Sequence, residues 1–110
     1  MLVKSVPAKD FKLIFDQGNF YRCKKFNLKV HRLNDDKDTV YFGAVISKKK
    51  DKLAVHRNRT RRLLREALRL SNLAGLGGMA FVFIPNEKGM GKSLVEYQGE
   101  IEDILKVINK

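Results

Sequence analysis

One basic stretch, Lys48–Leu70, carries most of the charge of this 110-residue chain. It holds ten lysine or arginine residues and only two acidic ones, Asp51 and Glu66, whereas the whole chain has a net charge of +11. Leucine and alanine recur through its second half at the three- and four-residue spacing of a helix. The stretch is therefore predicted to form an amphipathic helix over about residues 52–72, with Asp51 as its N-cap and one side facing a core.

Most of the arginines of this predicted helix fall on one side. At about 100° per residue from Arg57, an arc of roughly 140° holds Arg57, Asn58, Arg61, Arg62, Arg65 and Arg69. A sector of roughly 220–340° holds Thr60, Leu63, Leu64, Ala67 and Leu70, and only Leu68 breaks the division. Each pair of like charges four residues apart destabilises an isolated helix by about 0.2–0.5 kcal/mol. Because an anionic ligand would relieve that repulsion, we predict an anion-binding face.

The charge balance favours nucleic acid over a membrane surface as the partner. The isoelectric point is near 10.0, which indicates a polyanionic ligand. A membrane-binding helix needs bulky aromatic or apolar anchors beside a lysine-rich face, but this stretch is mostly arginine and has no aromatic residue. The planar arginine fork suits phosphate oxygens. The chain shows no apolar run long enough for a membrane span and no secretory signal, so a cytoplasmic location is expected.

No catalytic residue or metal ligand is predicted from the sequence. Cys23 is the only cysteine, which excludes an internal disulfide, and His31 and His56 do not form a familiar metal-ligand spacing. A lone cysteine could be a nucleophile, although a passive thiol is the preferred interpretation. Its basic neighbours would lower the pKa of the Cys23 thiol if that thiol is exposed. The acidic residues are scattered, and no small-molecule cofactor site is expected.

The remaining sequence alternates between strand and helix patterns. Helices are predicted over about residues 8–17 and 94–108, the second capped by Ser93, and strands over about 20–21, 26–31, 39–47 and 79–84. Gly43, inside the third of these strands, indicates a bulge or a close backbone approach. The chain is therefore predicted to be a single domain over residues 1–110. Its fold class is an α/β (α+β) two-layer sandwich, with a small mixed sheet of about four strands and three helices in the order αβββαβα.

The basic stretch resembles the signature of the bacterial ribonuclease P protein subunit family. Within it, the arginine–asparagine–arginine element is the specific feature. The residues that carry the resemblance are Ser47–Lys49, Ala54–Ala67, Phe11–Gly18 and Phe26. The resemblance spans about Phe11–Ile84 and implies a small α/β sandwich with an unusual left-handed βαβ crossover.

Members of that family pair with a large catalytic RNA, which removes the 5′ leader from precursor tRNA by metal-assisted hydrolysis. The resemblance implies that the catalytic groups lie in the RNA and that Mg²⁺ acts mainly through it. The expected partners are the ribonuclease P RNA and precursor tRNA, with no membrane and no obligate protein partner. The chain would then be the RNA-binding subunit of an endoribonuclease, without catalytic residues of its own.

The resemblance also assigns two groups of site residues. The contacts with the catalytic RNA that it implies are Arg57, Asn58, Arg59, Arg61, Arg62 and Arg65, with Lys48 and Lys49 beside them. We expect Arg69, on the same side of the helix, to join them. A cleft between the first helix and the sheet would bind the single-stranded leader through Phe11 and Phe15, and we expect Phe26 and Lys29 to line it as well. Lys29 stands where some members have an aromatic residue, so a phosphate contact would replace stacking there. Whether the three phenylalanines line this cleft or lie in the core stays open.

Three other functions fit parts of the sequence. A structural RNA-binding protein, such as a ribosomal protein, could use the same helix on ribosomal RNA. A DNA-binding helix-turn-helix fits poorly, because the basic helix follows a strand and not a short turn after another helix. A stand-alone protein nuclease would need catalytic groups that the sequence does not indicate.

Overall fold

The computed structural model describes residues 1–48 and 52–109, and within them the chain forms a five-stranded sheet and three α-helices. In chain order the elements are β1 (Leu2–Ser5), α1 (Phe11–Gln17), β2 (Asn19–Arg22), β3 (Phe26–Arg32), β4 (Thr39–Ala44), α2 (Ala54–Leu70), β5 (Met79–Pro85) and α3 (Leu94–Ile108). Short 3₁₀ turns precede α1 at Ala8–Asp10 and α3 at Glu87–Gly89. None of the described helices is long and apolar enough to cross a membrane.

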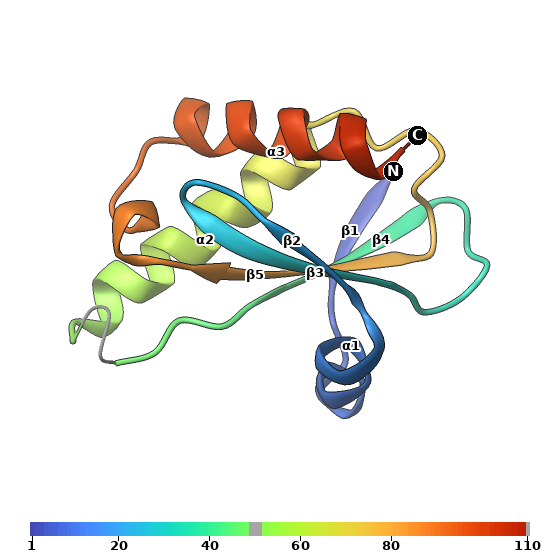
Figure 1. The fold of residues 1–110 in the computed structure, drawn as a ribbon, viewed down its shortest axis with the longest axis horizontal. Helices are drawn as coiled ribbons and strands as arrows, with labels where there is room; N and C mark the ends of the chain where they lie inside the picture. The colour runs from blue at the N-terminus through green and yellow to red at the C-terminus, as the bar shows by residue number, and fades with distance from the viewer. Residues whose placement is uncertain (49–51, 110) are drawn as a thin grey trace.

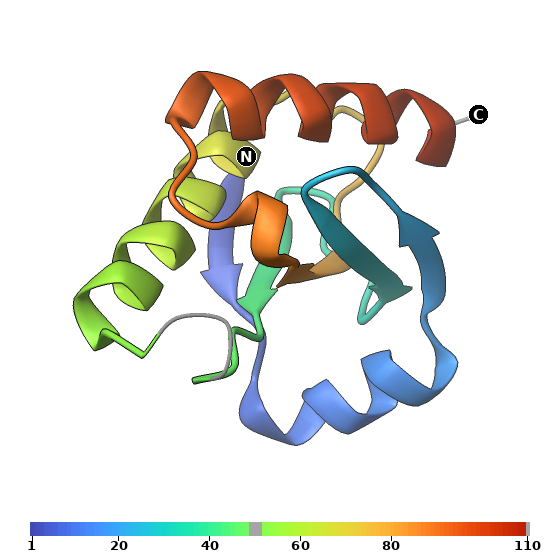
Figure 2. The ribbon, with the colours of Figure 1, turned by 60° about the vertical axis from the view of Figure 1, so that its left-hand side comes forward.

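The sheet is mixed, and its strands are ordered β1-β4-β5-β3-β2. The parallel neighbours β4 and β5 are joined through α2, and β3 runs antiparallel to β5. Helices α2 and α3 cover one face of the sheet, whereas α1 lies alone on the other face (Figure 1; Figure 2). The predicted fold class is confirmed, with one strand more than expected.

The additional strand is β1, which the sequence pattern does not reveal. It has only four residues, and only Val3 is half-buried. It forms by pairing in parallel with β4, where Val3 lies opposite Val40. Because β1 is stabilised by a partner far away in the sequence, its own residues show little of the alternation between apolar and polar that would predict a strand.

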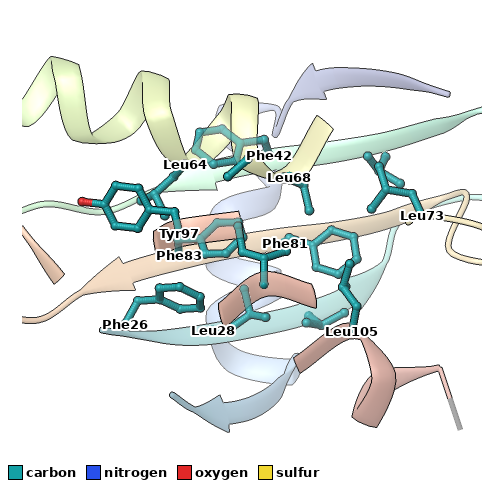
Figure 3. Close-up of a cluster of buried hydrophobic side chains, with 14 of the residues drawn as sticks. Phe26, Leu28, Phe42, Leu64, Leu68, Leu73, Phe81, Phe83, Tyr97 and Leu105 are labelled. Carbon is teal, nitrogen blue, oxygen red and sulfur yellow. The ribbon is translucent and has the colours of Figure 1, made fainter. Parts of the chain in front are cut away.

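The main core lies between the sheet and the helices α2 and α3. Phe26, Leu28 and Val30 alternate along β3 and all point into it. The rings of Phe26 and Phe83 pack edge to face with centroids 5.0 Å apart (Figure 3). A second, smaller cluster on the α1 side consists of Val6, Ile14, Ala80 and Val82.

Helix α2 buries a different stripe from the one that the sequence predicts. Leu68 is completely buried, and Leu64 and Leu68 both point from α2 into the core (Figure 3). Leu70, which was expected in the core, is 44% exposed. Compared with the prediction, the buried side of α2 is therefore rotated away from Leu70 and toward the side that carries Arg57 and Arg61. The helix begins two residues later than predicted with Leu53 at its N-cap, and Asp51 lies outside the described residues.

Two local expectations are confirmed. A Cβ atom added to Gly43 would lie 2.8 Å from Cζ of Phe11, so glycine allows the Phe11 ring to pack closely against β4. The Ser93 hydroxyl accepts a hydrogen bond from the backbone N–H of Glu96, and the Glu96 carboxylate accepts one from the backbone N–H of Ser93. This capping box fixes the start of α3 at the predicted residue.

Candidate nucleic-acid interface

One side of α2 carries most of the arginines of the helix. We call it the arginine face, and it consists of Arg57, Asn58, Arg61, Arg62, Arg65 and Arg69. Asn58 belongs to it, because its side-chain oxygen accepts a hydrogen bond of 3.2 Å from the Arg61 guanidinium. Arg62 is exposed, and Arg61 is half-buried. The face can therefore offer several guanidinium groups at once to a phosphate backbone.

Arg65 also has a structural role. Its guanidinium donates one hydrogen bond of 2.7 Å to the carbonyl of Val3 and another of 3.1 Å to the Ser5 hydroxyl. Both acceptors lie on β1, so Arg65 fastens the edge strand to α2. Because a guanidinium has five N–H donors, Arg65 can still contact an anion.

Arg69, at the end of the arginine face, is paired within the helix. Its Nε donates to the Glu66 carboxylate at 3.0 Å, and its terminal nitrogen contacts the other carboxylate oxygen. These hydrogen bonds hold the pKa of Glu66 below its usual value and raise the pKa of Arg69. Glu66 offsets the charge of Arg69, which makes Arg69 a weaker candidate for RNA binding than Arg61 or Arg62.

Arg59 lies away from the arginine face. At about 200° from Arg57 it falls outside the basic arc. It lines a separate pocket of about 230 Å³ between α2 and the segment before α3, together with His56, Thr60, Leu63, Gly91 and Lys92. The arginine–asparagine–arginine element is thus divided: Arg57 and Asn58 lie on the arginine face, and Arg59 lies in the separate pocket. Lys48 is exposed, and Lys49 lies outside the described residues.

A second pocket joins the arginine face to the first helix. It measures about 360 Å³ and is lined by Ser5, Val6, Phe11, Phe42, Ala44, Arg61, Arg62 and Arg65. Its lining combines apolar residues, among them the half-buried Phe11, with three arginines of the arginine face. The prediction from the sequence places the arginines at the contact with the catalytic RNA and Phe11 in the leader cleft. Ser5, the last residue of β1, also lines this pocket, and the sequence pattern does not predict β1.

The other predicted cleft residues divide between the two faces of the sheet. Lys29 lies on the α1 side, where its ammonium group donates a hydrogen bond of 3.0 Å to the carbonyl of the half-buried Phe15. Phe26 points to the opposite face and is completely buried against Phe83. The expectation that Phe26 lines the cleft is therefore wrong, because strand alternation places it in the main core. Phe20, which was not predicted as a cleft residue, is 50% exposed beside Lys29.

Cys23 behaves differently from the expectation for an exposed thiol among basic residues. Burial, together with the negative charge of Glu100, raises the pKa of the Cys23 thiol from 9.0 to about 11. The Glu100 carboxylate is held beside it by backbone N–H groups, at 2.7 Å from Lys24 and 3.0 Å from Lys25. The thiol is therefore protonated and unreactive near neutral pH.

This raised pKa predicts slow alkylation of Cys23 in the folded protein. The rate with iodoacetamide should rise with pH to a midpoint near 11 when the chain is folded, and near 9.0 when it is unfolded in urea. Since the folded state holds the proton more tightly, this group should also reduce stability as the pH rises from about 9 to about 11. Equal midpoints for the folded and unfolded chains would contradict the assignment.

Comparisons with known proteins agree on one family. The sequence model of the Ribonuclease P family matches residues 6–109. The ribonuclease P protein component of Pseudomonas savastanoi pv. phaseolicola is 36% identical over 100 residues, which cover 87% of this chain and 73% of that protein. The component from Pseudomonas putida is 38% identical over 87 residues, covering 79% of this chain and 63% of that protein.

Solved structures show the same fold. The RNase P protein of Thermotoga maritima superposes with a TM-score of 0.79 at 23% identity and covers 94% of this chain and 96% of that one. The RNase P protein of Staphylococcus aureus gives a TM-score of 0.75 at 20% identity and covers 96% of this chain and 94% of that one. At these identities the structures establish the fold, and the sequence matches establish the family. The chain belongs to the ribonuclease P protein component family.

Proposed function

We propose that this chain is the protein subunit of ribonuclease P and assists removal of the 5′ leader from precursor tRNA. The observation that carries the proposal is the pocket shared by Phe11 and the arginine face in a member of this family. An aromatic ring beside guanidinium groups is a combination suited to single-stranded RNA. A single surface can thus face both the catalytic RNA and the leader.

The arginine face is the part that we assign to the catalytic RNA. Arg61 and Arg62 are the main residues of this assignment, because the guanidinium of Arg65 is hydrogen-bonded to β1 and that of Arg69 to Glu66. A helix surface that carries only positive charges can bind along a phosphate backbone without recognising the base sequence. Arg59 and Lys92, in the pocket of about 230 Å³, would extend the contact around the helix.

The leader would run along the α1 side of the sheet. Phe11 and Phe15 are half-buried there, so neither residue is fully enclosed by the protein. Lys29 can offer its remaining N–H donors to a phosphate while it holds the Phe15 carbonyl. Such contacts tolerate leaders of varied sequence, because every base has a face that can stack.

The chemistry itself is assigned to the RNA. Two of the carboxylates that could have served as acid or base groups are committed to structure: Glu66 pairs with Arg69, and Glu100 binds the backbone of Lys24 and Lys25. In this proposal Mg²⁺ acts mainly through the RNA, and the protein binds substrate and screens phosphate repulsion. A structural RNA-binding role remains the second candidate, and family membership favours the first.

The leader site is tested by measuring affinity for leader-bearing and leaderless tRNA. The protein, assembled with ribonuclease P RNA, should strengthen binding of the leader-bearing substrate at least about fivefold more than that of mature tRNA, as expected for one stacked base. The matched control is the RNA subunit alone with the same two ligands. An equal gain for both would exclude a leader site and leave only general screening of charge.

A further inference from the structure

Phe20 is exposed in a way that sets it apart from the other phenylalanines. The chain has seven, all within the described residues, and six are buried or half-buried. Phe20 exposes 50% of its surface on β2, the edge strand that follows α1 (Figure 2). A single exposed apolar residue is ordinary on a protein surface. Its surroundings are what distinguish this one.

A lysine that also contacts α1 lies over the ring. Phe20 lies directly opposite Lys29 in the antiparallel pair of β2 and β3, so both side chains lie on the α1 side of the sheet. The Lys29 ammonium lies 5.5 Å from the centre of the Phe20 ring and is anchored at 3.0 Å by the carbonyl of Phe15. The cation orients the ring and places a positive charge beside it.

We propose that Phe20, oriented by Lys29, is a stacking site for an unpaired RNA base. The inference rests on the proposed function and extends the leader site from Phe11 and Phe15 across β3 to the edge of the sheet. Base stacking requires an accessible aromatic face, and a neighbouring ammonium group can bind the adjoining phosphate. Phe20 thus supplies the accessible aromatic ring that the sequence assigned to the buried Phe26.

A fluorescent reporter tests the site directly. The chain contains no tryptophan, so Phe20→Trp introduces a single one. The control is Val95→Trp, because Val95 is 77% exposed on α3, on the opposite side of the sheet. A single-stranded oligoadenylate should quench the fluorescence of Phe20→Trp and leave that of Val95→Trp almost unchanged. Equal quenching, or none at either position, would overturn the proposal.

A second experiment separates stacking from simple apolar contact. In the holoenzyme, Phe20→Ala and Phe20→Leu should each weaken binding of leader-bearing precursor tRNA by between about 5-fold and 150-fold, and Phe20→Tyr should retain it. The salt dependence should be unchanged, since no charge is removed. Thermal unfolding of each variant confirms that it is folded, and Phe20→Leu retains apolar bulk where alanine does not.

The outcomes distinguish this inference from the function on which it rests. If the unaltered protein favours leader-bearing tRNA and the Phe20 variants bind it equally well, the stacking site is wrong and the subunit assignment stands. If Phe20→Leu binds as well as Phe20→Tyr, Phe20 makes only an apolar contact. If leaderless tRNA loses the same affinity as the leader-bearing form, Phe20 contacts another part of the complex.

Discussion

Replacing Arg61 and Arg62 together with alanine should weaken binding to ribonuclease P RNA on the order of 100-fold or more. Both residues line the pocket beside Phe11, and Arg62 is exposed on the arginine face. A hydrogen bond to a charged group contributes about 1.5–3 kcal/mol, so two lost contacts give this magnitude. Filter binding over a salt series should also show that the slope of log K against log salt falls by about two units.

The control for this variant removes the same charge from a different surface. Lys88 and Lys106 are both exposed and lie outside α2, so Lys88→Ala with Lys106→Ala should change affinity far less. If both double variants lose the same affinity, net charge alone drives binding and the arginine face has no special role.

Leu68→Ala should destabilise the fold by about 2–5 kcal/mol, which is the usual cost of a cavity left by a fully buried leucine. Leu68 is completely buried between α2 and the sheet. Urea denaturation measures the loss directly, and the melting temperature should fall by about 10 °C or more. The fully folded fraction should still bind RNA, because Leu68 is not on the arginine face.

Leu70→Ala is the matched control, two residues further along the same helix. Leu70 is 44% exposed, so its truncation should change stability by less than about 1 kcal/mol. The helical wheel drawn from the sequence predicts the opposite ranking. A larger loss for Leu70→Ala than for Leu68→Ala would show that α2 packs as the sequence suggested.

The regular elements were predictable because their signals are local. The period of α3 and its Ser93 cap lie within one short segment, and the alternation of Phe26, Leu28 and Val30 fixes β3 in the same way. Strand β1 has no such signal, because its pairing with β4 joins Leu2 to Thr39 across the chain. Its absence from the prediction also hid the Arg65 tether and the pocket that joins Phe11 to the arginines.

The sequence predicts which types of residue form the candidate site, but not the direction in which each side chain faces. Helical spacing shows that Arg61, Arg62 and Arg65 share one side, but it does not show how far the sheet reaches around the helix. Strand alternation likewise separates Phe26 from Lys29, yet only the placement of α1 shows which face of the sheet stays accessible. Phe20 therefore could not be preferred over Phe26 from the sequence.

Cleavage of precursor tRNA by the ribonuclease P RNA at low Mg²⁺, with and without this protein, tests the central claim most directly. At low Mg²⁺ the RNA lacks counterions to bring it together with the substrate, and the arginine face should supply that positive charge. Adding the protein should restore cleavage at the mature 5′ end, and the Arg61/Arg62 double variant should restore much less. No enhancement by the unaltered protein would contradict its assignment as the ribonuclease P subunit.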